Sequence, residues 1–142
     1  MITKRRMIKQ SIVFSAVVSA LIACAGCAVT PNPLKPDAIM PDKVVVMHIH
    51  SFDPATVTIK AGQTVVWENT TGLGIYHTVT CDPAVAQNMD DASYPPGAHA
   101  FDSGDINSKD SWEHTFTVPG TYKYFCIPHE SHGMLGKVIV TP

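Results

Sequence analysis

The most constraining feature of this sequence is a series of short runs rich in β-branched and aromatic residues, separated by glycine and proline. Each run is too short for an ordinary helix, and several alternate apolar with polar residues, as strands with one buried face do. The runs lie at residues 43–50, 56–60, 64–68, 76–81, 100–103, 112–118, 122–126 and 136–141. Eight such runs predict an all-β sandwich or barrel, and a domain of this length buries enough apolar surface to fold without a disulfide.

The first 23 residues are typical of an export signal. A basic start is followed by an uncharged apolar run at 12–23, and this run ends just before Cys24. The ending resembles the bacterial lipobox, whose cysteine is acylated and becomes the first residue of the mature chain. We therefore expect a lipoprotein-type signal peptide at 1–23 and a lipid on Cys24. An uncleaved membrane anchor and a simple secretory signal are the alternatives, and all three place the domain outside the cytoplasm.

Residues 24–42 are expected to form a tether between the lipid and the domain at 43–142. This segment has little apolar content, so it cannot bury enough surface to fold alone. Its prolines favour an extended, semi-rigid spacer. They are Pro31, Pro33, Pro36 and Pro41.

The charge of the mature chain narrows the possible partners. Beyond the leader there are six lysines, no arginine and twelve acidic residues, which gives a net charge of −6. Nucleic-acid binding is disfavoured, because the phosphate backbone requires a basic face. An acidic surface instead favours basic protein partners through electrostatic steering.

Four side chains have the donor types of one particular metal centre. Cys126, His129 and Met134 lie within nine residues of one another, and His77 lies about fifty residues upstream. One thiolate, two imidazoles and a weak axial thioether are the ligands of a trigonal copper centre suited to electron transfer. Strand parity places His77 and Cys126 near strand ends on inward faces, so both are expected at the same end of the sandwich.

Longer segments resemble the cupredoxin family, and within it the plastocyanin-like bacterial copper proteins. The resemblance covers residues 43–141, and its most specific part is 116–126 followed by the spacing C-x2-H-x4-M. Other matching segments lie at 52–54, 62–67, 77–79, 101–104 and 129–136. The resemblance implies an eight-stranded Greek-key β-sandwich. It also implies one type 1 copper ion, and the ligands it implies are His77, Cys126, His129 and Met134.

Two alternatives concern the metal and its fourth ligand. Zinc also binds cysteine and histidine, although a thioether and a single thiolate favour copper. His132 lies three residues after His129, so a shorter ligand loop would use it in place of Met134. The segment Gly133-Met134 matches the family better.

An H-x-H pair at His48 and His50 is a candidate for a second metal, because both side chains of a strand with this spacing face one side. We interpret the pair as surface residues of the strand. A multicopper oxidase is disfavoured, since such enzymes have several H-x-H motifs and a histidine before the ligand cysteine. Phe125 occupies that position here.

The remaining cysteines leave one question open. Cys81 shares a strand face with His77, which favours a buried free thiol. A disulfide between Cys81 and Cys27 is the alternative in an oxidising compartment. Cys27 is also a second, poorer acylation site. Thr78 departs from the family, where asparagine is common, and we expect its hydroxyl to hydrogen-bond to the ligand loop.

The expected function is one-electron transfer at a mononuclear copper site that cycles between Cu(II) and Cu(I), without enzymatic turnover. The chain is expected to be a monomeric domain, lipid-anchored in the bacterial cell envelope, on the periplasmic or extracytoplasmic side. The expected partners are redox proteins, such as a c-type cytochrome or a terminal reductase. A copper storage or delivery protein is the alternative. Such proteins usually bind an exchangeable metal through several methionines or histidines at an open site, and the sequence shows no cluster of methionines.

Overall fold

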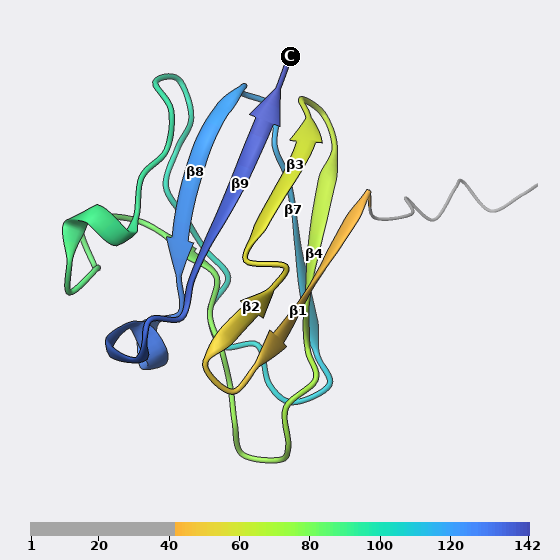
Figure 1. Ribbon diagram of the computed structural model, residues 1–142, viewed down its shortest axis with the longest axis vertical. Helices are drawn as coiled ribbons and strands as arrows, with labels where there is room; N and C mark the ends of the chain where they lie inside the picture. The colour runs from red at the N-terminus through yellow and green to blue at the C-terminus, as the bar shows by residue number, and fades with distance from the viewer. Residues whose placement is uncertain (1–41) are drawn as a thin grey trace, which may run out of the picture. The chain divides into compact units, whose positions relative to one another are not determined.

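Two β-sheets packed face to face form the folded part of the computed structural model, which describes residues 42–142 (Figure 1). The export signal, Cys24, Cys27 and the tether up to residue 41 lie outside the described residues. The first sheet has the order β2-β1-β4-β7 and the second the order β3-β9-β8-β5-β6. The strands are β1 Lys43–His48, β2 Ser51–Asp53, β3 Thr56–Lys60, β4 Thr64–Asn69, β5 Thr80–Cys81, β6 Phe101–Asp102, β7 Ser111–Thr115, β8 Gly120–Phe125 and β9 Leu135–Thr141.

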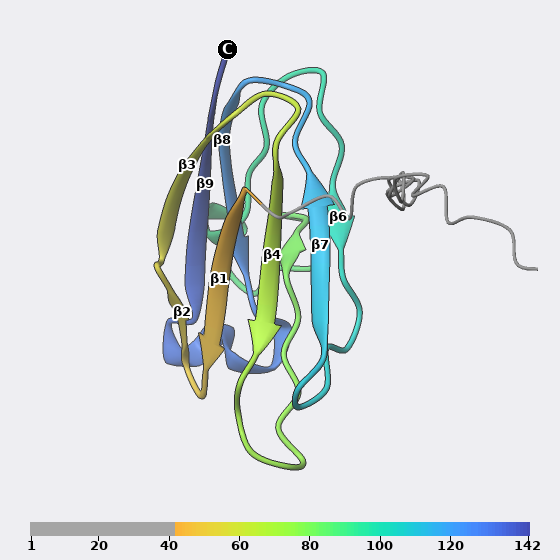
Figure 2. The same cartoon turned by 90° about the vertical axis from the view of Figure 1, so that its right-hand side faces the viewer.

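The predicted all-β sandwich is confirmed, and each of the eight predicted runs overlaps a strand. A ninth short strand, β2, is added because the chain turns at residues 49–50 and folds back on β1. The chain then crosses from the first sheet to the second to form β3 and returns to form β4. These crossings explain why β1 pairs with β4, and β3 with β9, in parallel. Figure 2 shows the two layers from the side.

The core lies between the sheets and is built by alternating side chains. In β3 the buried residues are Val57 and Ile59, and in β8 they include Tyr122 and Tyr124. Trp67 of β4 is fully buried and meets Tyr124 edge-on, with ring centroids 5.4 Å apart. The two sheets are therefore joined by large aromatic contacts, which stabilise a stiff scaffold.

One end of the sandwich carries the loop between β8 and β9. This loop contains the 3₁₀ helix η2, Ile127–His132, and a second 3₁₀ helix, η1, spans Met89–Asp91. In Figures 1 and 2 the turn between β1 and β2 lies beside η2. Gly136 follows the loop, and a Cβ there would lie 2.2 Å from the Tyr124 ring, so the close approach of β9 to β8 requires glycine.

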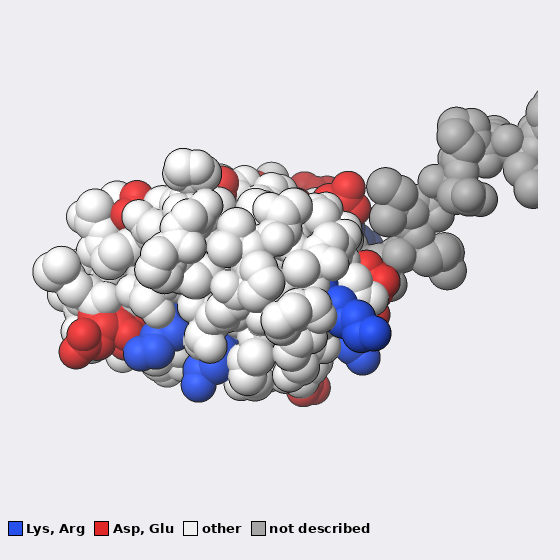
Figure 3. Space-filling view, turned by 90° about the horizontal axis from the view of Figure 1, so that it is seen from above, with Lys and Arg blue, Asp and Glu red and all other residues white. Residues whose placement is uncertain are grey.

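The end of the sandwich opposite η2 carries few charged side chains. In the face seen from above in Figure 3, lysine and acidic side chains lie mainly toward the rim, and most of the surface carries neither. That face offers no extended basic patch for a nucleic acid. Within residues 42–142, no helix has the length and apolar character needed to cross a bilayer.

Candidate metal centre

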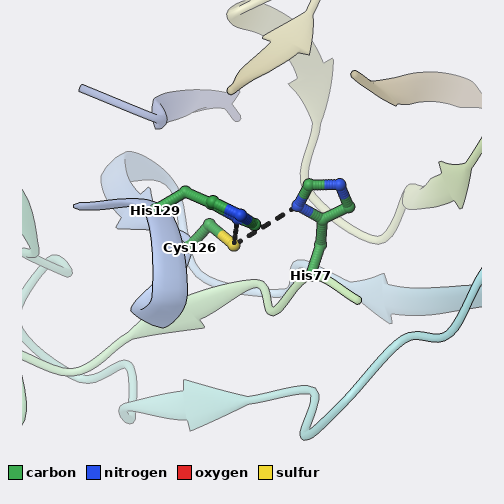
Figure 4. A group of neighbouring side chains, drawn as sticks. All are labelled: His77, Cys126 and His129. Carbon is green, nitrogen blue, oxygen red and sulfur yellow. Dashed lines mark hydrogen bonds between the residues drawn. The ribbon is translucent and has the colours of Figure 1, made fainter. Parts of the chain in front are cut away.

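Three of the four predicted ligands converge at the end of the sandwich that carries η2. The Cys126 Sγ lies 3.5 Å from His77 Nδ1 and 3.4 Å from His129 Nδ1 (Figure 4). All three donor atoms lie within 4.8 Å of one another. His77 and Cys126 are fully buried, whereas His129 is half-buried. Two segments separated by about fifty residues in sequence thus supply one cluster, as strand parity predicts.

The His77 segment enters the core just before β5. The backbone N–H and C=O of His77 pair with Ile106 in an isolated β-bridge, at 3.1 and 2.8 Å. Ser103 Oγ accepts a hydrogen bond from the Val79 N–H at 2.8 Å. His77 Nε2 is buried with no hydrogen-bond partner among residues 42–142. Packing and backbone pairing, rather than a bond to the outer ring nitrogen, therefore orient this imidazole.

The ligand loop is a compact turn that brings its two ends together. Cys126 follows β8 directly, and the His129 N–H donates to the Cys126 carbonyl at 3.0 Å. Gly133 ends η2 in the left-handed conformation with φ of 75°, which glycine adopts without strain. The Cys126 N–H then donates to the Met134 carbonyl at 3.1 Å. Met134 is fully buried, so the fourth predicted ligand lies inside the same end of the core.

Thr78 connects the two ligand segments. Its backbone N–H donates to Cys126 Sγ at 3.3 Å, and its Oγ1 accepts from the Ile127 N–H at 2.9 Å. The expected hydrogen bond to the ligand loop is confirmed. The hydroxyl continues to Thr80 at 2.9 Å, and the Thr80 hydroxyl donates to Asp102 at 2.9 Å. A chain of hydrogen bonds thus runs from the ligand loop to a surface carboxylate.

Burial and neighbouring histidines favour the neutral form of both imidazoles in the metal-free protein. Burial, then the neighbouring His129 and His50, lower the pKa of His77 from 6.5 to about 4. Burial, then His50 and His132, also lower the pKa of His129. Burial raises the pKa of the Cys126 thiol, and the Thr78 N–H partly opposes this shift. Neutral imidazoles are ready to bind a metal, and a bound cation removes the proton of a coordinating thiol.

The spacing of the donors fits a metal ion. Bonds of about 2.0 Å to nitrogen and 2.3 Å to sulfur, as in zinc sites, hold the two atoms about 3.5–3.7 Å apart at tetrahedral to trigonal angles. The sulfur–nitrogen distances of 3.4 and 3.5 Å are close to this value. A single buried thiolate with two imidazoles and a buried thioether favours copper over zinc.

Glu130 was not predicted from the sequence, yet it holds the ligand loop. Its side chain is 6% exposed, and its two carboxylate oxygens accept from the backbone N–H groups of Gln87 and Asn88, each at 3.0 Å. The loop before η1 is thereby fixed to η2. Its position between His129 and Met134 is the only signal in the sequence that Glu130 could matter to the site. The sequence does not reveal its hydrogen-bond partners, because they are backbone N–H groups.

The other candidate histidines have separate surroundings. His48 Nε2 lies 3.8 Å from an Asp53 carboxylate oxygen, whereas His50 stacks on His132 with ring centroids 4.4 Å apart. All three histidines are exposed, in agreement with surface roles for His48 and His50. The H-x-H spacing therefore does not make one site, because the turn after β1 carries His50 toward η2.

Cys81 is buried and free among residues 42–142, and its Sγ–H donates to the Ser93 carbonyl at 3.2 Å. Burial raises the pKa of this thiol to about 12, which keeps it protonated and unreactive at neutral pH. The alternative disulfide with Cys27 stays a prediction, because Cys27 lies outside the described residues.

Comparison with known proteins identifies the family. The sequence model described as "Copper binding proteins, plastocyanin/azurin family" matches residues 43–141, nearly the whole described domain. The chain belongs to the plastocyanin/azurin family. His77, Cys126, His129 and Met134 are the ligands of its type 1 copper site.

Similar proteins include plastocyanins, a halocyanin and amicyanin. Chloroplastic plastocyanin of Tetradesmus obliquus is 39% identical over 97 residues, which cover 63% of this chain and 57% of that protein. The halocyanin of Natronomonas pharaonis is 35% identical, covering 63% of this chain and 48% of that protein. A structure of an amicyanin mutant in its reduced Cu(I) form at pH 4 has a TM-score of 0.53 and 30% identity, and covers 69% of this chain and 80% of that one. The chain thus spans about half the length of two of these relatives.

Proposed function

We propose that this plastocyanin/azurin family member is a one-electron carrier that cycles between Cu(II) and Cu(I) and performs no enzymatic turnover. The observation that carries this proposal is the enclosure of the copper ligands. His77, Cys126 and Met134 are each fully buried, and only His129 reaches the surface. Such a site exchanges electrons through one edge while excluding a substrate from the metal.

The protein contributes a fixed geometry to the redox change. Copper bound by one thiolate, two imidazoles and a weak thioether supplies the redox couple. Thr78 fixes the two ligand segments to each other, and Glu130 fixes the ligand loop to the loop before η1. Because these contacts resist movement of the ligands, little reorganisation accompanies a change of charge at the site.

The half-buried edge of His129 is the proposed route for the electron. A shallow pocket of about 120 Å³ beside it is lined by Gly74, Ile75, Tyr76, Pro128 and His129. Exposed apolar side chains next to these lining residues in the sequence, or among them, include Leu73, Tyr76 and Ile127. An apolar face around one ligand suits transient docking of a redox protein, for which we propose a c-type cytochrome or a terminal reductase.

We also propose that the domain works as a monomer in the bacterial cell envelope, lipid-anchored on the periplasmic or extracytoplasmic side. The support is the sequence alone: a lipoprotein-type signal at 1–23, a lipid on Cys24 and a proline-rich tether at 24–42. The net charge of −6 beyond the leader favours a basic partner by electrostatic steering. A lipid anchor would confine the carrier to the membrane surface where such partners are held.

Copper storage or delivery is the competing function, and it requires a metal that exchanges readily. Three buried ligands argue against ready exchange. The deciding experiment measures two rates on the copper-loaded protein: electron self-exchange by NMR line broadening, and transfer of Cu(I) to an apo copper acceptor. We expect fast self-exchange and copper loss that is slower by orders of magnitude. Rapid transfer of Cu(I) with slow self-exchange would make delivery the function.

The docking face has its own test. Ile127→Ser removes an exposed apolar side chain beside the ligand loop, and Val85→Ser removes one from the loop before η1. We expect the first change to slow electron transfer to a cytochrome c while the second has little effect. Equal slowing by both variants would reject the His129 edge as the route.

A further inference from the structure

Two histidines that the copper site does not use lie together on the surface next to it. His50, in the turn between β1 and β2, and His132, the last residue of η2, are both exposed. Their rings are stacked with centroids 4.4 Å apart and planes 4° from parallel. The His50 ring also lies 5.2 Å from that of His129. Segments about eighty residues apart in sequence thus place three imidazoles side by side.

The two rings are near enough for one nitrogen of each to reach a shared metal ion once the side chains turn. Two imidazole nitrogens bonded to one metal at about 2.0–2.1 Å lie about 2.9–3.4 Å apart for angles between square and tetrahedral. Imidazole binds a metal through a nitrogen lone pair in the plane of the ring, so the two parallel rings, with centroids 4.4 Å apart, must turn about χ1 and χ2 before both lone pairs meet at one ion. Both side chains are exposed and already in contact, so we expect these rotations to occur without movement of the backbone.

The surroundings favour a bound cation. Ser131 Oγ lies 3.5 Å from His132 Nδ1, which leaves Nε2 as the free nitrogen of that ring. A partner on one ring nitrogen is the usual arrangement for a histidine that binds a metal through the other. The domain is acidic overall, so it attracts cations to its surface. The neighbouring Glu130 carboxylate is engaged by two backbone N–H groups and does not form an ion pair with either histidine.

We propose that His50 and His132 form a second, surface metal site, which takes one divalent transition-metal ion of the kind that imidazole prefers, such as Zn(II) or Cu(II). The site is open to solvent and has two protein ligands, so water completes the coordination and the ion exchanges readily. This binding does not depend on the proposed electron-carrier function.

A consequence for the copper site does rest on that function. An ion held by His50 and His132 adds positive charge beside His129, which favours Cu(I) over Cu(II) in the buried site. The reduction potential therefore rises when the surface site fills. The same ion covers part of the face proposed for docking, so electron transfer to a partner slows.

The test is a Zn(II) titration of the full chain already loaded with Cu(II), with binding followed by calorimetry and the copper site by its visible absorption. Zn(II) is redox-inert, and an unchanged absorption shows that it has not displaced the copper. We expect one Zn(II) per chain and a rise in the copper potential. His50→Ala and His132→Ala are each expected to weaken binding by about tenfold or more, since each removes one of two ligands.

His48→Ala is the matched control, because His48 belongs to the same H-x-H pair but lies against Asp53. Its affinity for Zn(II) is expected to equal that of the unchanged protein. Retained visible absorption in all three variants shows that the ligand loop is intact. The proposal is overturned if Zn(II) does not bind, if binding survives both His50→Ala and His132→Ala, or if His48→Ala weakens it equally. If Zn(II) binds to His50 and His132 but the reduction potential of the copper site does not change, the proposed effect of the surface ion on the copper is wrong.

Discussion

The two segments that supply the copper ligands are held by different interactions. The His77 segment is fixed by backbone pairing to Ile106 and by complete burial. Among residues 42–142, the ligand loop from Cys126 to Met134 pairs with no neighbouring strand, and side chains hold it instead: Thr78 at one point and Glu130 at another. The buried segment therefore depends on the sandwich as a whole, whereas the ligand loop depends on a few polar contacts that single substitutions remove.

The largest expected effect is the pH dependence of the unfolding free energy, which reports on the burial of His77. The folded metal-free protein holds His77 neutral with a pKa of about 4, against 6.5 when exposed. Between these values the unfolded chain binds the extra proton, so the contribution of His77 to stability falls as pH falls from 6.5 to 4 and changes little below that. The full shift corresponds to at most about 3 kcal/mol. The lowered pKa of His129 acts in the same direction.

Denaturant unfolding of the metal-free protein at several pH values measures this loss. His77→Gln removes the titrating group, so its unfolding free energy should depend less on pH over that interval. His48→Ala, which changes an exposed histidine, should keep the full dependence. A His77→Gln protein with an unaltered pH profile would show that burial of this imidazole does not control acid stability.

A substitution in the ligand loop should cost somewhat less. Glu130→Ala removes the acceptor of two hydrogen bonds and frees the loop at Gln87 and Asn88. We expect a loss of about 2 kcal/mol in unfolding free energy, since the freed N–H groups are near solvent and regain part of the loss from water. Copper should also dissociate faster, because the loop that carries His129 is less restrained.

Glu113→Ala is the control for that change, because the exposed side chain of Glu113 on β7 makes no hydrogen bond or ion pair among residues 42–142. Its effect should lie within about 0.5 kcal/mol. If the two alanine variants have equal stability and equal copper dissociation rates, the ligand loop is not held by Glu130.

The smallest expected effect concerns the link between the two segments. Thr78→Val keeps the backbone N–H that faces Cys126 Sγ but removes the hydroxyl, which accepts from the Ile127 N–H and bonds to Thr80. Thermal or denaturant unfolding should show a loss of about 1 kcal/mol, because the Ile127 N–H loses its acceptor whereas the Thr80 hydroxyl keeps its bond to Asp102. Thr58→Val, at an exposed position of β3, is the control and should leave stability nearly unchanged. A greater loss at Thr58 than at Thr78 would argue against a structural link.

The same contrast explains what the sequence could predict. The alternation of apolar residues identified the eight runs, and strand parity placed His77 and Cys126 together, because both depend on local periodicity. The turn that separates β2 from β1 was not predicted, since nothing in residues 49–50 marks a break as glycine or proline would. That turn decides the position of His50. The contact of His50 with His132 therefore could not be predicted from the alternation of apolar and polar residues.

The contact between Glu130 and the loop before η1 also could not be predicted from the sequence. Glu130 accepts from backbone groups more than forty residues away, and every residue except proline has such a group. No residue type at Gln87 or Asn88 therefore signals the contact. The Thr78 hydroxyl was expected to reach the loop because the family resemblance had already placed the two segments together.

The central claim, that the four ligands form one type 1 copper site, is tested most directly by the visible and EPR spectra of the protein loaded with Cu(II). Cys126→Ser and Met134→Leu are measured beside it. We predict an intense blue band with narrow copper hyperfine coupling, lost in Cys126→Ser and shifted in Met134→Leu, because the thiolate provides the covalency and the thioether is a weak axial donor. A pale, ordinary Cu(II) spectrum that Cys126→Ser leaves unchanged would contradict the claim.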